Sequence, residues 1–147
     1  MKRSKLGRTG FEVAPLAFGG NVFGWTADEA TSFRLLDAFV DAGGNLIDTA
    51  NSYSRWVPGH QGGESEAIIG RWIAKRRRHD DVVVATKVGS DMGQGEKCLR
   101  RDDIMQAADE SLRRVRGDAS DLYQSHRGGG TTPARRWCRR NSMAISR

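Results

Sequence analysis

Two hydrophobic periodicities alternate along residues 1–126. Short apolar runs of strand length occur at residues 15–18, 46–47, 82–86 and 121–125. Between these runs, apolar residues recur every three or four positions, as they do on one face of a helix, and residues 68–73 are a clear example. Strands that alternate with helices in this way favour right-handed βαβ units and a parallel sheet.

Polar residues and glycines indicate where the helices begin and end. Thr26 and Glu29 are spaced like a capping box at the start of the first helix, which we expect to stop at Gly43. Asp102 is the expected N-cap of the third helix, and Gly117 is its expected end.

Two shorter segments have simple interpretations. Residues 6–11 read as a turn between two extended pieces and predict a small hairpin. The basic run at residues 75–78 falls at the expected C-terminus of the second helix, where cations are favoured. We therefore interpret that run as a solvated helix end and not as a binding patch.

Composition is that of a soluble globular domain. The chain has 147 residues, of which 37% are hydrophobic and 29% are charged. It has no apolar run of about 18 residues or more, which argues against a transmembrane helix, and no signal-peptide core follows the basic N-terminus. The two cysteines, Cys98 and Cys138, cannot form a disulfide framework, so we expect a reducing, cytoplasmic setting.

The net charge of +6 at first suggests a nucleic-acid partner, but its distribution argues against one. All 18 acidic residues lie in residues 1–126, where 18 basic residues balance them. The whole excess comes from six arginines in residues 127–147, a segment with no helical or strand periodicity. We therefore expect a folded domain at 1–126, a disordered tail at 127–147, and no nucleic-acid binding.

Three polar residues follow predicted strands at equal spacing. Asp48, Lys87 and His126 lie 39 residues from one to the next, as expected for one βα unit each, and Tyr53 lies in the loop after Asp48. Each residue alone has an ordinary structural reading. Together they suggest a site, because the carboxyl ends of barrel strands are where catalytic groups converge.

These residues lie within motifs that resemble those of the aldo-keto reductase family. The similar stretches are residues 6–13, 16–20, 48–53, 63–66 with 69–70, 85–88 and 121–126. The resemblance implies the N-terminal half of a (β/α)8 TIM barrel, with a hairpin, four parallel strands and three helices. It also implies carbonyl reduction by hydride transfer.

The resemblance assigns roles to four residues. Tyr53 matches the family's general acid, which protonates the oxygen of the carbonyl group. A phenol has an unperturbed pKa near 10 and is helped by a nearby cation, and Lys87 matches that cation. Asp48 matches the carboxylate that orients Lys87, while His126 matches the residue that hydrogen-bonds the substrate carbonyl.

The resemblance further implies a cofactor and a substrate class. NADPH is the expected hydride donor and a small-molecule aldehyde or ketone the expected substrate, with no metal and no membrane partner. By analogy, Gly20 and Asn21, together with Asp48, lie near the nicotinamide.

The chain departs from the family after His126. A barrel of this type has eight strands and about 250 residues, and only four strands are predicted here. The family typically continues with Trp-Asp-Asp-Pro, and a one-base shift of plausible codons for residues 129–138 yields that sequence. We therefore hypothesise a frameshift or truncation.

A half-barrel with two open sheet edges should be a poor enzyme. We expect the 147-residue chain to be inactive as a reductase, to bind no NADPH and to self-associate. The alternative is a non-enzymatic half-barrel that pairs with a second copy or with a missing half.

Overall fold

The computed structural model describes residues 1–93, 99–117 and 120–126. Two strands form an antiparallel hairpin, and four others form a parallel sheet in the order β3-β4-β5-β6. In chain order the elements are β1 (Ser4–Lys5), β2 (Glu12–Val13), β3 (Ala17–Gly19), α1 (Glu29–Asp41), β4 (Leu46–Asp48), α2 (Glu64–Arg76), β5 (Val83–Val88), α3 (Arg101–Val115) and β6 (Leu122–Ser125). The predicted alternation of strands and helices is confirmed.

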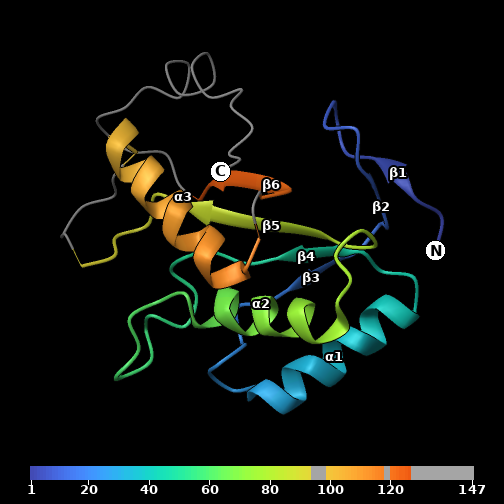
Figure 1. The fold of residues 1–147 in the computed structure, drawn as a ribbon, viewed down its shortest axis with the longest axis horizontal. Coiled ribbons are helices and arrows are strands. Elements are labelled where there is room, and N and C mark those ends of the chain that lie inside the picture. The colour runs from blue at the N-terminus through green and yellow to red at the C-terminus, as the bar shows by residue number, and fades with distance from the viewer. Residues whose placement is uncertain (94–98, 118–119, 127–147) are drawn as a thin grey trace.

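The three helices cover one face of the sheet (Figure 1). Strand residues that point toward the helices, such as Ile47 and Val84, are buried in one core with Leu36 of α1 and Trp72 of α2. The indole Nε1 of Trp72 donates to Asp37 Oδ1 at 2.7 Å and so ties α2 to α1. The apolar residues that recur at helical spacing therefore form the core, as the sequence pattern predicts.

The opposite face of the sheet has less cover. A cavity of about 260 Å³ on this face is lined by Leu6 from the hairpin region and by residues of all four parallel strands. In the described part of the chain, β3 and β6 each have a sheet neighbour on one side only. This face is where the partner elements of a closed barrel would lie.

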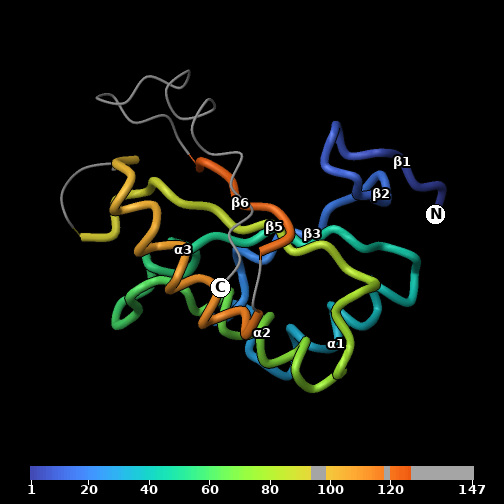
Figure 2. Tube along the Cα trace, turned by 45° about the horizontal axis from the view of Figure 1, so that its top comes forward, coloured from blue at the N-terminus to red at the C-terminus, as the bar shows by residue number. Residues whose placement is uncertain are grey.

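The hairpin lies near the amino ends of the strands (Figure 2). The buried side chain of Asn45, just before β4, holds it there. Asn45 Oδ1 accepts from the backbone N–H of Ala14 at 2.8 Å, and its Nδ2 donates to the carbonyl of Glu12 at 2.9 Å. A single amide therefore satisfies two backbone groups of the segment that leads from the hairpin into the sheet.

Two predicted helix starts are wrong. The N-cap of α1 is Asp28, whose Oδ1 accepts from Thr31 N at 2.8 Å, because Thr26 belongs to a turn closed by a Gly24 N to Ala27 O bond. Arg100 precedes α3, so Asp102 lies inside its first turn.

The expected end of α3 is confirmed. The helix ends at Val115, and Arg116, with φ 56°, is its left-handed C-cap directly before Gly117. The prediction of a disordered tail concerns residues 127–147, which lie outside the described residues. Within the described residues, no helix is long and apolar enough to cross a membrane.

Candidate active site

The sheet brings two of the predicted site residues together at its carboxyl end. Asp48 is the last residue of β4, and Lys87 is the last residue but one of β5. Side chains alternate along a strand, and their neighbours Ile47 and Thr86 are buried under the helices. Asp48 and Lys87 therefore face the opposite, more open side of the sheet.

Lys87 is the centre of a hydrogen-bonded cluster. Its Nζ donates to Asp48 Oδ2 at 2.6 Å, to the carbonyl of Thr49 at 2.8 Å and to Tyr53 Oη at 2.9 Å. Tyr53 Oη in turn donates to Asp48 Oδ2 at 3.0 Å. All three N–H groups of the ammonium thus have acceptors, and Tyr53 is held between a cation and a carboxylate.

Burial and charge act in opposite directions on Tyr53. Burial raises the pKa of the Tyr53 hydroxyl above its ordinary value, while the hydrogen bond and the charge of Lys87 oppose that rise. The phenol therefore stays protonated at neutral pH, with a cation in contact that stabilises its anion. Such a group can give up a proton and recover it.

His126 lies beside Tyr53 and outside the Lys87 cluster. It directly follows β6, and its backbone N–H donates to the carbonyl of Val88 at 2.8 Å. Its ring centroid lies 5.8 Å from that of Tyr53, with the planes at 78°. Its Nδ1 is within hydrogen-bond distance of Ser90 Oγ at 3.1 Å and of Ser52 Oγ at 3.4 Å.

The two serines were not predicted as site residues. Both follow predicted strands, but serine is common in such loops, and only the fold shows that these two meet one imidazole. All four predicted chemical residues thus lie in one region, with His126 positioned next to the Tyr53 ring.

Gly20 and Asn21 lie next to this region. The Gly20 N–H donates to the carbonyl of Asp48 at 2.8 Å, and a Cβ at Gly20 would approach the Ser65 hydroxyl to 2.9 Å. Gly19 is exposed and pairs with Asp48 across the sheet, and a Cβ there would meet only Asn21 Oδ1, at 3.6 Å. The end of β3 therefore leaves a bare backbone surface beside Asp48, which a flat ring could occupy.

An aromatic wall extends from Tyr53 to the surface, and it too was missed from the sequence. Trp56 lies 6.4 Å from Tyr53 and 5.7 Å from Trp25, between ring centroids, and both tryptophans are about half exposed. The two come from loops far apart in sequence, so no local pattern indicates that they meet. Among the described residues, no group of His, Cys, Asp or Glu is arranged to hold a metal ion.

The family assignment rests on comparison with known proteins. The model of the "Aldo/keto reductase family" matches residues 15–145. The chain belongs to the aldo/keto reductase family. The match continues past residue 126, so the expected domain boundary there, like the frameshift hypothesis, stays a prediction.

This chain covers very different shares of two of its relatives. It is 52% identical over 101 residues to an uncharacterized 11.2 kDa protein of Pseudescherichia vulneris, covering 68% of this chain and 98% of that one. It is 39% identical over 140 residues to the uncharacterized oxidoreductase YrpG of Bacillus subtilis, covering 90% of this chain but 42% of YrpG.

A solved structure supports the fold. The holo form of aldo-keto reductase AKR11C1 from Bacillus halodurans is similar with a TM-score of 0.74 and 32% identity, covering 92% of this chain and 43% of that one. This likeness confirms the predicted fold class, the N-terminal half of a (β/α)8 barrel. The chain spans less than half the length of YrpG and of AKR11C1.

Proposed function

We propose that residues 1–126 carry the proton-transfer half of an NADPH-dependent carbonyl reductase site. The observation that carries the proposal is the contact of the Lys87 ammonium with both Tyr53 Oη and Asp48 Oδ2. Reduction of a carbonyl leaves negative charge on its oxygen, which requires a proton donor already in place. Tyr53 is that donor, Lys87 stabilises the phenolate left behind, and Asp48 fixes and balances Lys87.

The end of β3 fits the reacting ring of a nicotinamide cofactor. Gly19 offers bare, exposed backbone next to Asp48, and the Gly20 turn is fixed by its N–H bond to the Asp48 carbonyl. When bound, the cofactor supplies the hydride. Asn21, which follows that turn, is the residue proposed to hydrogen-bond the edge of such a ring.

His126 would act on the substrate oxygen. Its ring lies against Tyr53, so a carbonyl oxygen within reach of Tyr53 Oη lies near the imidazole as well. Ser52 and Ser90, both near Nδ1, orient the ring. Two donors on one oxygen fix the carbonyl plane and favour the charged transition state.

The substrate is a small aldehyde or ketone that enters along the aromatic wall. Trp25 and Trp56 are half exposed and continue from Tyr53 to the surface, so they offer stacking area next to the proton donor. A carbonyl attached to a ring is therefore favoured over a small aliphatic one.

The 147-residue chain alone is expected to be inactive. The open face of the sheet beside Lys87 leaves the site accessible to water. Water weakens the electrostatic interactions among Lys87, Asp48 and Tyr53, which a closed site would strengthen. We expect no NADPH binding by tryptophan-fluorescence titration of this chain. A discrete dimer by light scattering, with activity, would instead favour two half-barrels that pair.

The function is tested in a chimera of residues 1–126 with the remaining barrel of the Bacillus halodurans reductase. We expect NADPH-dependent reduction of an aromatic aldehyde, with kcat lowered about 10²- to 10⁴-fold by Tyr53→Phe while NADPH affinity is unchanged. A chimera that binds NADPH and reduces the aldehyde equally well with Phe at position 53 would show that Tyr53 is not the acid.

A further inference from the structure

Two neighbouring side chains in the first turn of α2 are fully buried directly behind the Lys87 cluster. Ser65 and Glu66 are both 0% exposed. A buried carboxylate is unfavourable unless hydrogen bonds and an opposite charge compensate it. The hydrogen bonds of both side chains go to residues other than Lys87, Asp48 and Tyr53, so their burial needs another explanation.

Ser65 connects the turn after β3 with the end of β4. Its hydroxyl donates to the carbonyl of Gly20 at 2.7 Å and lies 2.8 Å from Thr49 Oγ1. Because the single serine proton is used on Gly20, Thr49 is the donor in the second bond. Thr49 follows Asp48 directly, and its carbonyl is one of the three acceptors of the Lys87 ammonium.

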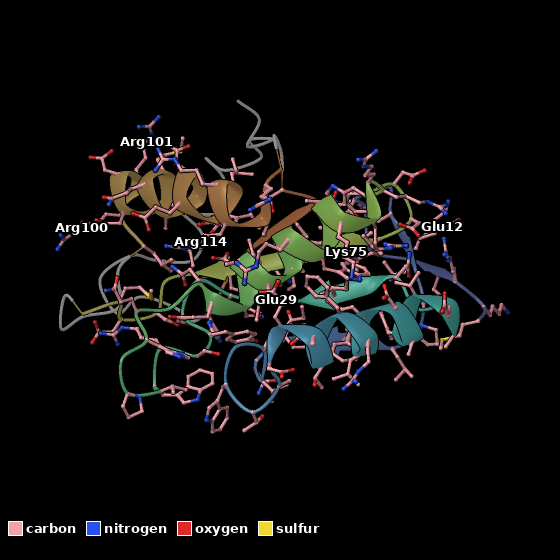
Figure 3. The ribbon with its side chains drawn as sticks, turned by 60° about the horizontal axis from the view of Figure 1, so that its bottom comes forward. Glu12, Glu29, Lys75, Arg100, Arg101 and Arg114 are labelled. Carbon is pink, nitrogen blue, oxygen red and sulfur yellow. The ribbon has the colours of Figure 1, made fainter. Side chains whose placement is uncertain are left out.

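Glu66 holds the end of β5 in a similar way. Its Oε1 accepts from Thr86 Oγ1 at 2.5 Å, and Thr86 directly precedes Lys87. Its Oε2 accepts from Arg114 Nη1 at 3.0 Å, and Arg114 also donates to Glu110 at 3.0 Å. Arg114 reaches toward α2 from α3, as Figure 3 shows, so the carboxylate has its compensating charge.

We propose that Ser65 and Glu66 are positioning residues that fix the ends of β4 and β5 at the spacing at which Lys87 reaches Tyr53. Ser65 acts through Thr49, beside Asp48, and Glu66 acts through Thr86, beside Lys87. Two consecutive residues of one helix turn thereby set the distance between two strand ends. The catalytic meaning of this spacing rests on the proposed function, but the contacts do not.

The pKa of Tyr53 reports on this spacing without any enzyme assay. The chain has two tyrosines, Tyr53 and Tyr123, so tyrosine labelled with ¹³C at Cζ gives two NMR signals, which Tyr123→Phe assigns. Asp48 and Tyr53 lie five residues apart on one segment, whereas Lys87 lies on the next strand. If the strand spacing changes, Tyr53 therefore loses the influence of Lys87 more than it loses the influence of Asp48. Lys87 lowers the pKa of Tyr53, so this loss raises that pKa.

The test variants are Ser65→Ala and the nearly isosteric Thr86→Val, in the full 147-residue chain. Both should raise the pKa of Tyr53 in an alkaline NMR titration, with circular dichroism confirming the native fold. Thr86→Ser, which keeps the hydroxyl, should restore the value of the unchanged chain.

Two matched controls separate positioning from general destabilisation. Glu110→Gln weakens the other contact of Arg114 without touching Thr86, and Ser32→Ala removes a fully buried hydroxyl that bonds the carbonyl of Asp28 at α1. Both should leave the pKa of Tyr53 unchanged.

The proposal is overturned if folded Ser65→Ala or folded Thr86→Val leaves the pKa of Tyr53 unchanged. It is also overturned if Thr86→Ser or either control raises it equally. If one test variant unfolds, the other decides. Because this titration uses no cofactor or substrate, absence of reductase activity in the chimera would count against the proposed function alone.

Discussion

The two ends of the parallel sheet carry similar kinds of polar side chains in different arrangements. At the amino end they form separate contacts, each of which ties neighbouring segments of the chain together. Asn45 holds the hairpin, and Asp121 Oδ2 accepts from Val84 N and lies 2.8 Å from His79 Nε2. At the carboxyl end, Asp48 and Tyr53 converge on the ammonium of Lys87.

The two ends differ in the property that their polar contacts control. Each amino-end side chain completes hydrogen bonds of the backbone or of one ionic partner, so its loss should change stability. At the carboxyl end, an ionisable hydroxyl sits between opposite charges on an open face, so a change there should alter proton chemistry. In parallel barrels, catalytic residues come from the carboxyl ends of strands, while the other end serves stability.

The largest stability effect is expected at Asn45. Asn45→Ala leaves the Ala14 N–H and the Glu12 carbonyl without their partner and should lower the free energy of unfolding by about 2–4 kcal/mol. Urea unfolding followed by circular dichroism measures it. A much smaller loss would show that these two contacts contribute little to stability.

A smaller effect is expected at Asp121. Asp121→Ala removes the acceptor of the Val84 N–H at the start of β5 and should destabilise the chain by about 1–2 kcal/mol. The pKa of Tyr53 should stay unchanged, because Asp121 lies at the other end of the sheet. A change in the pKa of Tyr53 would contradict the distinction between the two ends of the sheet.

The smallest effect is the pH dependence of the His79–Asp121 pair. The hydrogen bond to Asp121 raises the pKa of His79, although partial burial opposes this. The folded-state pKa lies above the unfolded one, so the stabilisation is full below about pH 6.5 and is lost as pH rises through the folded value.

His79 is 38% exposed, so solvent weakens this contribution. Urea unfolding of the unchanged chain and of Asp121→Asn should therefore give free energies that differ more at mildly acidic than at alkaline pH. A difference independent of pH would show that the pair does not involve a charged His79.

Local sequence signals predict much of this arrangement. The strand and helix periods locate β3 to β6 and α1 to α3, and the strand ends locate Asp48, Lys87 and His126. The error at the start of α1 has a local cause, because Asp28 is as good a cap as Thr26 and the chain around Phe23 folds into a buried turn.

Contacts between distant segments could not be predicted in the same way. Ser65 and Gly20 are 45 residues apart, and Arg114 and Glu66 are 48 apart. A serine and a glutamate at a helix start fit exposed capping roles equally well, so only the packing of α2 against α3 and the sheet shows their burial.

The most direct measurement is the pKa of Tyr53 in the Lys87→Met variant of the otherwise unchanged chain. The ¹³Cζ NMR signal of Tyr53 reports that pKa. If the carboxyl-end residues form one proton-transfer unit, the pKa of Tyr53 rises above that of the unchanged chain, because the cation that favours the phenolate is gone. An unchanged pKa in a folded Lys87→Met chain would contradict the account.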